Sequence, residues 1–230
     1  MITNLQLNNF KAHKIVDLPL ARLNVFTGLN GTGKSSVIHS LLLLRQSYLK
    51  NMIGKGLVLN GDLVEIGVVN DALNEGGENI CFKLKLDEKT EMEWIYDKNL
   101  FGSFLKTLSA PTTQDYELIS LFNSHFQYIS AEHFSAFETH KRDSLQVEEN
   151  RQISEKKGGG EHAVYFLDYY GDKEKLLDQS LQHHKVISDN IREQTDAWLG
   201  EISPGVRTVI KVNESQNNLQ LRFQFKSEYG

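Results

Sequence analysis

The stretch Gly28-Leu29-Asn30-Gly31-Thr32-Gly33-Lys34-Ser35 fits the pattern G-x-x-x-x-G-K-[ST], which describes a P-loop, a loop that binds phosphate groups. Residues 21–27 before it are predicted to form a short apolar strand, and residues 36–50 after it an amphipathic helix. Strand, glycine loop and helix in this order are the context in which the pattern is meaningful. The alternative is a glycine-rich turn with a surface lysine, which gives Lys34 and Ser35 no structural purpose.

The residue types of this loop suit a nucleoside triphosphate with its magnesium ion. Glycines let the loop wrap closely with its N–H groups pointing inward, and the positive end of the next helix attracts phosphate oxygens. Lys34 is predicted to contact the β- and γ-phosphates and to act in catalysis, and the Ser35 hydroxyl to be a Mg²⁺ ligand. The predicted phosphate-binding set is Asn30, Gly31, Thr32, Gly33, Lys34, Ser35 and Ser36.

The composition bounds the class of protein. The 230 residues are 40% hydrophobic and 24% charged, which is ordinary for a globular chain, and the net charge of −5 argues against a nucleic-acid-binding polycation. The single cysteine, Cys81, excludes an internal disulfide and a multi-cysteine zinc site, and we expect it to be a buried small side chain. Without a long apolar run or a signal peptide, we expect a cytoplasmic protein with no membrane partner.

Hydrophobic periodicity predicts the other elements of the first half. Two strands precede the P-loop, at residues 2–10 and 15–20, and alternation over residues 79–97 predicts a β-hairpin. The helix at 36–50 has Arg45 and Gln46 opposite its apolar stripe. Residues 126–131 are predicted to form a buried strand that ends at Glu132 and His133, where nucleotide sites of α/β sheets lie, so both can face the γ-phosphate.

The second half is more polar. We expect helices at residues 161–170 and 172–198, the second stopped by Gly200 and Pro204, and a terminal β-hairpin from residues 206–212 and 219–225. His39 is expected to be packed rather than functional, and the neighbours His183 and His184 do not share a helix face, which disfavours a metal site.

Four segments together resemble known ATPases. I-x-x-L-x-L-x-N-F-K from Ile2 to Lys11 and V-F-T-G-L-N-G-T-G-K-S-S from Val25 to Ser36 resemble the SMC, RecF and OLD-type ATPases. V-I-H-S-L-L-L-L-R-Q-S over residues 37–47 and Y-I-S-A-E over residues 128–132 resemble a narrower bacterial subgroup of stand-alone AAA ATPases with an ABC-like fold. Several members of this subgroup are found in antiphage defence operons beside a nuclease.

The resemblance implies an α/β fold of the ABC-ATPase-like P-loop type, with an N-terminal antiparallel β-subdomain that covers the nucleotide base. It implies an ATP-binding lobe at residues 1–132 and a helical insertion with the terminal hairpin at 133–230. The fold would be incomplete at the C-terminus, because the signature and Walker B motifs are expected after residue 230. It also implies ATP and Mg²⁺ as cofactors and a homodimer or higher oligomer of the full-length protein.

The resemblance also assigns three residues outside the loop. Lys11 and His13 follow the first strand, where the family places base- or ribose-contacting residues; the alternative is a solvated loop. Glu132 stands roughly at the place of the ABC Q-loop glutamine, near Mg²⁺ or the attacking water; the alternative is a surface salt bridge or a structural role. Because hydrolysis also needs a second carboxylate and a water-orienting residue, we expect this chain alone to bind ATP–Mg²⁺ weakly and to hydrolyse it poorly.

Two stretches look like the missing motifs. Gly158-Gly159-Gly160-Glu161 resembles part of an ABC signature, and residues 163–168 resemble the apolar run and aspartate of Walker B. An entire helix normally separates those motifs, whereas here only His162 does, and Asp168 is followed by Tyr169 rather than a glutamate. We therefore expect a glycine turn that leads into a buried helix.

Three functions remain open. The first is a defence ATPase that dimerises on ATP and controls a partner nuclease. The second is a DNA-maintenance ATPase of the RecF or SMC type, although no sustained heptad run predicts an SMC-type arm, and direct DNA contact stays uncertain. The third is a module that senses nucleotide or assists assembly and does not hydrolyse ATP.

Overall fold

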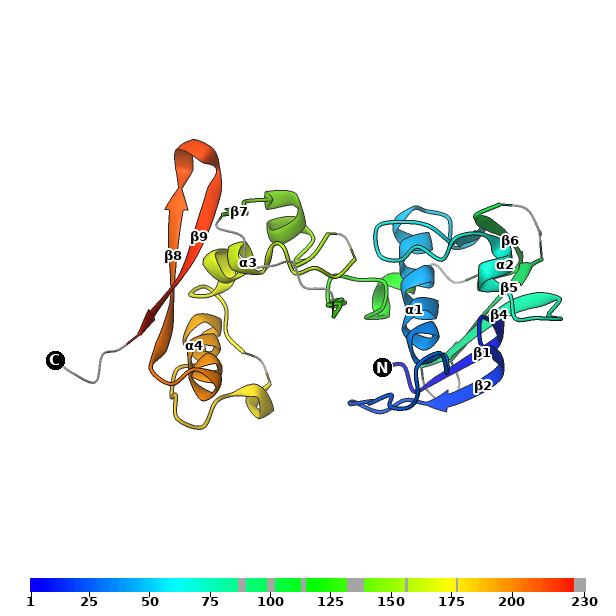
Figure 1. Cartoon of the computed structure of the whole chain (residues 1–230), viewed down its shortest axis with the longest axis horizontal. Coiled ribbons are helices and arrows are strands. Elements are labelled where there is room, and N and C mark those ends of the chain that lie inside the picture. Colours follow the sequence, from blue (N-terminus) through cyan, green and yellow to red (C-terminus); the bar gives the residue numbers. More distant parts are fainter. Residues whose placement is uncertain are drawn as a thin grey trace. The chain divides into compact units, whose positions relative to one another are not determined.

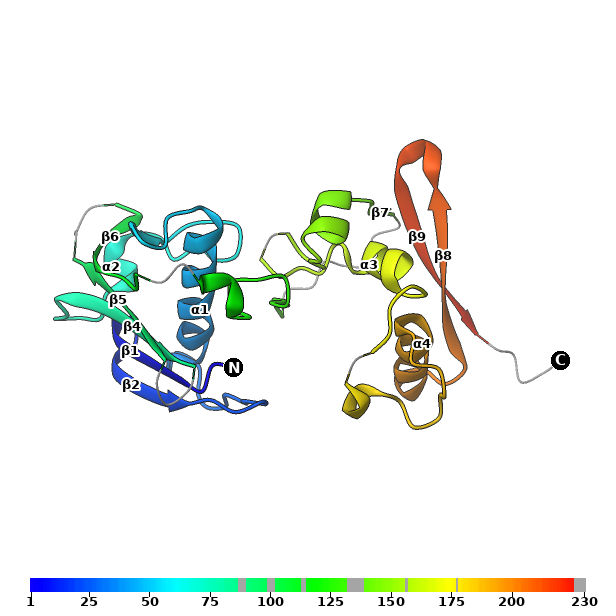
Figure 2. The same cartoon turned by 180° about the vertical axis from the view of Figure 1, so that it is seen from behind.

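The computed structural model describes residues 1–86, 90–98, 102–112, 115–131, 139–155, 157–176 and 178–225. The chain divides into two compact units, Met1–Phe126 and Gln127–Gly230, which are coloured blue to green and green to red in Figure 1 and seen from behind in Figure 2. Among the described residues, no helix combines the length and the apolar character that crossing a membrane requires.

The first unit contains a six-stranded sheet with the strand order β2-β1-β4-β5-β6-β3. All of its pairings are antiparallel. The predicted N-terminal strands and the predicted hairpin over residues 79–97 are confirmed, while the turn residues 87–89 lie outside the described residues. The strands are β1 (Asn4–Phe10), β2 (His13–Pro19), β3 (Gly56–Val58), β4 (Asn79–Lys85), β5 (Glu91–Asp97) and β6 (Phe104–Ser109).

Strict alternation explains why one face of this sheet is buried. Successive side chains of a strand point to opposite faces, so Leu7 of β1, Phe82 of β4 and Trp94 of β5, which are neighbours in register, share one face. All three are fully buried. The other buried apolar residues of the strands in this sheet are Leu5, Phe10, Leu57, Ile80, Leu84, Met92, Tyr96 and Leu105.

Helix α1 (Lys34–Leu49) follows the P-loop and contacts β1 and β3. The predicted helix is confirmed, and Arg45 and Gln46, which lie opposite the predicted apolar stripe, are buried as well, with 5% and 2% of their surfaces exposed. Gln46 donates from Nε2 to the Val58 carbonyl oxygen at 2.6 Å and accepts from the Val64 N–H at 3.2 Å. These hydrogen bonds satisfy the buried amide group of Gln46. Helix α1 can therefore be packed on this side as well as along its apolar stripe.

Two further short helices complete the first unit. They are α2 (Val69–Ala72) and the 3₁₀ helix η1 (Asp115–Leu118).

The predicted strand before the P-loop is not formed. Residues 21–27 pair with no strand in the described part of the chain, and Leu23 and Val25 are 80% and 74% exposed. A strand is defined by its ladder to a neighbour, and apolar alternation alone does not provide one. This segment therefore runs as an exposed connection from β2 to the loop.

The strand predicted at residues 126–131 is also not formed. Ser130 donates its backbone N–H to the Gly158 carbonyl oxygen at 2.8 Å, but no ladder follows, and Ile129 is 57% exposed. The reason is the same: a short apolar run needs a neighbouring strand to become one. Glu132 and His133, predicted at the end of this strand, lie outside the described residues.

The second unit packs short helices against a three-stranded antiparallel sheet in the order β7-β9-β8. The predicted terminal hairpin is confirmed by β8 and β9, and the predicted helix at 161–170 by α3. Its core contains Val147, Val164, Tyr165, Tyr170 and Leu219. The elements are β7 (His140–Lys141), the π-helix η2 (Leu145–Glu149), α3 (Ala163–Tyr170), the 3₁₀ helix η3 (Gln179–Leu181), α4 (Ile191–Ile202), β8 (Val206–Asn213), the 3₁₀ helix η4 (Glu214–Gln216) and β9 (Asn218–Phe225).

The single long helix predicted at 172–198 is wrong, because η3 and α4 replace it. The side chain of Asn190 accepts the Glu193 N–H and starts α4 afresh, which is the role of an N-cap. Gln194 accepts the His183 N–H and donates to the Ser188 carbonyl oxygen, so side-chain hydrogen bonds satisfy the backbone between η3 and α4. Gly200 does not stop α4, which runs to Ile202.

Candidate nucleotide-binding site

The P-loop is built on three glycines with positive φ. The φ angles of Gly28, Gly31 and Gly33 are 141°, 81° and 91°, in a region that side chains rarely adopt. Gly33 is the N-cap of α1, and no side chain caps this helix start. The first N–H groups of a helix have no partner within it, so this end of α1 offers donors and the positive pole of its dipole to an anion.

Lys34 lies at the mouth of this loop. Its Nζ donates to the carbonyl oxygens of Gly28 and Leu29 at 2.9 and 2.5 Å. The hydroxyl of Thr32 also donates to the Leu29 carbonyl oxygen, at 2.9 Å. A phosphate oxygen is a stronger acceptor than these carbonyl oxygens because it carries charge. The ammonium group of Lys34 is therefore held within the loop, where an anion can compete for it.

The structure brings His13 to the loop, although the two are separated by twenty residues. Nε2 of His13 lies 3.0 Å from the Gly33 carbonyl oxygen, which can only accept, so this nitrogen carries the proton and donates. A Cβ atom at Gly33 would lie 2.6 Å from Nε2. Gly33 is thus required for its φ angle and for the close approach of His13, and β2 supports the start of α1.

Lys11 lies near His39 of α1. Its backbone has a left-handed φ of 50° and is held by the Ala72 carbonyl oxygen and the Asn74 side chain, at 2.7 and 2.6 Å. Burial lowers the pKa of His39, and the charge of Lys11 lowers it further. The imidazole of His39 is half-buried, and its Nδ1 has no partner among the described residues.

The predicted phosphate-binding residues differ in exposure. Asn30, Gly31, Thr32 and Ser35 are exposed, while Gly33 and Lys34 are half-buried. Ser36 is 4% exposed, within the packed part of α1. Around Gly33 the structure therefore assembles the loop, Lys34 and His13, and Glu132 lies outside the described residues.

Residues 163–168, which resemble a Walker B segment, begin helix α3 and form no strand. The expectation of a glycine turn leading into a buried helix is confirmed there. Sequence reasoning missed the contact between His13 and Gly33, because nothing in the local pattern of either segment signals the other.

A comparison with curated proteins found no match. A comparison with protein families found one match, to the AAA ATPase domain family, over residues 1–223. This match includes the P-loop, both N-terminal strands and most of the terminal hairpin. The chain therefore belongs to the AAA ATPase domain family.

Proposed function

We propose that this chain binds ATP with Mg²⁺ at residues 28–36. In this proposal Lys34 contacts the β- and γ-phosphates, Ser35 binds Mg²⁺, and the N–H groups at the start of α1 hold phosphate oxygens. The observation that carries it is the uncapped start of α1 at a left-handed Gly33, with the Lys34 ammonium held at the loop mouth. His13 and Lys11 are proposed to contact the base or ribose; the contact of His13 with Gly33 supports this role.

The finer identity rests on the resemblance to ABC-type heads. We propose an ATPase that dimerises on ATP and regulates a partner nuclease in a defence system, with Glu132 near Mg²⁺ or the attacking water. The antiparallel sheet that contains β1, β2, β4 and β5 supports the ABC-type part of the proposal, because the resemblance implies an N-terminal antiparallel β-subdomain.

A second candidate is a module that binds nucleotide without turnover. The exposure of residues 28–32 favours it, because catalysis needs a second carboxylate and an oriented water in a site closed to solvent. Binding and turnover therefore have to be measured separately.

The test measures ATP–Mg²⁺ affinity and phosphate release for the wild-type chain, Lys34→Ala and Lys50→Ala. Lys50 is the matched control, since it follows the far end of α1 and its ammonium group forms an exposed ion pair of 3.9 Å with Asp62. Loss of a charged donor to phosphate weakens binding by about 10- to 100-fold. We expect this loss in Lys34→Ala and no change in Lys50→Ala.

Equal affinities in the two variants would contradict the proposed site. Phosphate release by the wild-type chain that disappears in Lys34→Ala would reject the non-hydrolysing module. Binding without release would favour that module.

A further inference from the structure

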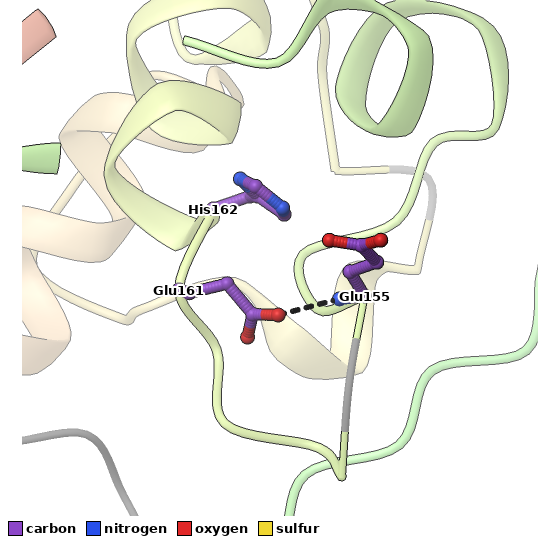
Figure 3. A group of neighbouring side chains, drawn as sticks. All are labelled: Glu155, Glu161 and His162. Carbon is purple, nitrogen blue, oxygen red and sulfur yellow. Dashed lines mark hydrogen bonds between the residues drawn. The ribbon is translucent and has the colours of Figure 1, made fainter. Parts of the chain in front are cut away.

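A second group of ligand-type side chains lies in the unit Gln127–Gly230, on the turn that precedes α3. Glu155, Glu161 and His162 each present a ligand atom, and these atoms all lie within 4.8 Å of one another. Figure 3 shows the imidazole and the two carboxyl groups around a common space. The proposed nucleotide site uses none of these residues.

The imidazole of His162 is the feature that points to a bound ligand. It is 6% exposed, and both of its ring nitrogens are buried with no hydrogen-bond partner among the described residues. Burying a polar group without a partner costs roughly 1–3 kcal/mol, so such groups are rare in folded proteins. A ligand that accepts the lone pair of one ring nitrogen would offset part of this cost, and the neighbouring carboxylates indicate that this ligand is a cation.

Hydrogen bonds hold the carboxylate of Glu161 in place. Its Oε2 accepts the Ser154 hydroxyl at 3.0 Å, and its Oε1 accepts the Glu155 backbone N–H at 2.8 Å, which Figure 3 marks with a dashed line. A carboxylate oxygen has two lone pairs, so it can accept a hydrogen bond and bind a metal ion at the same time. Hydrogen bonds of this kind orient the ligands in protein metal sites.

The turn between the two glutamates requires glycine. Gly158 and Gly160 have φ angles of 69° and 73°, and a Cβ atom at Gly158 would lie 2.7 Å from the Ser130 backbone nitrogen. The chain therefore reverses tightly and brings residue 155 back to residues 161 and 162. In the sequence these glycines resemble part of a signature motif. Their role in the chain reversal that forms the ligand group is visible only in the structure.

The donor set selects the class of ion. Imidazole nitrogen suits first-row transition metals, whereas Mg²⁺ and Ca²⁺ prefer oxygen ligands alone. Two carboxylates and one histidine form a three-ligand set that leaves a position open for water, as in mononuclear zinc sites. We propose that Glu155, Glu161 and His162 bind one divalent transition-metal ion, with Zn²⁺ the preferred one. The bound ion would join residue 155 to the start of α3, which supplies Val164 and Tyr165 to the core of this unit.

The test titrates the full chain, freed of metal with a chelator, with Zn²⁺ in competition with a chromogenic indicator. We expect one Zn²⁺ per chain, and binding weakened at least ~10-fold in both Glu155→Gln and His162→Ala. Matched controls are Glu149→Gln and His184→Ala, which alter an exposed glutamate and an exposed histidine of the same unit. Both controls should bind Zn²⁺ as the wild type does, which separates this site from nonspecific binding by surface side chains.

Glu155→Gln keeps the proposal falsifiable if His162→Ala fails to fold, because Glu155 is exposed and the substitution preserves its shape. The visible absorption spectrum of bound Co²⁺ provides a second readout, and we expect its ligand-field bands to change in Glu155→Gln. Zn²⁺ affinity unchanged in Glu155→Gln, or equal affinities of the wild-type chain for Zn²⁺ and Mg²⁺, would overturn the proposal.

Discussion

At the scale of single residues, Gly33 connects the phosphate loop to β2. Alanine there has to adopt a φ of 91° and places a Cβ atom against His13, whereas alanine at Gly31 meets nothing within 4 Å. A left-handed backbone costs a side-chain-bearing residue about 1–2 kcal/mol. We expect Gly31→Ala to lose about this much free energy of unfolding, and Gly33→Ala to lose more.

A double-mutant cycle tests whether His13 causes the larger loss of unfolding free energy in Gly33→Ala. If it does, the loss caused by Gly33→Ala is smaller in a His13→Ala background. Unfolding of the first unit can be followed by fluorescence of the buried Trp94 in a Trp198→Phe background, because these are the two tryptophans of the chain. Equal losses in the two glycine variants would contradict the close approach of His13.

The burial of His39 predicts how the stability of the first unit depends on pH. Its pKa in the folded chain is lowered below 6.5 by burial and by Lys11, so the unfolded chain binds more protons as the pH falls through 6.5. The folded state is therefore favoured above that pH and loses stability below it. We expect His39→Gln to lose less stability than the wild type between about pH 7.5 and about pH 5.5. Identical pH dependences of urea unfolding, read from Trp94, would contradict this prediction.

At the scale of elements, α1 is held to the rest of its unit by Arg45. Its Nη1 donates to the carbonyl oxygens of Leu121 and Asn123 at 2.7 and 3.0 Å, and its guanidinium lies 4.5 Å from the ring centre of Phe126. Burial lowers the pKa of Arg45 to about 10, so the side chain remains charged at neutral pH. It thus joins a helix to a segment more than seventy residues later in the chain.

Removal of this side chain leaves two carbonyl oxygens without their donor. We expect Arg45→Ala to lower the free energy of unfolding by about 2–4 kcal/mol. Arg22→Ala, at an exposed position, should change it by no more than about 0.5 kcal/mol. Urea unfolding monitored at Trp94 checks both, and a loss for Arg45→Ala as small as that for Arg22→Ala would show that the helix does not depend on this contact.

At the scale of the whole molecule, the apolar segment before the P-loop lies outside the core of its unit. Leu23 is 80% exposed, whereas Leu43 in α1 is fully buried. We expect Leu23→Ser to change the free energy of unfolding by less than about 0.5 kcal/mol, and Leu43→Ala to lower it by about 2–5 kcal/mol. A large loss for Leu23→Ser in urea unfolding would mean that this segment is covered in solution, by a strand or by a second copy of the chain.

The amino-acid sequence by itself determined the elements that depend on local patterns. Strict alternation specifies β4, β5, β8 and β9, because side chains of a strand alternate between its faces whatever the rest of the chain does. The glycines and Lys34 specify the loop in the same way, because left-handed φ angles and a positive charge are properties of the residues themselves.

Only the tertiary structure decided which features found partners distant in the chain. Residues 21–27 have strand-like alternation but no neighbouring strand among the described residues. Arg45 has a charged side chain, yet it is buried because it donates to a carbonyl oxygen seventy-six residues away. The approach of His13 to Gly33, and the return of Glu155 to Glu161 and His162, likewise depend on how the backbone folds. Ladders, burial and ligand groups depend on pairs of residues that are distant in the chain. The glycine loop and the helix after it could therefore be predicted from the sequence, whereas their surroundings could not.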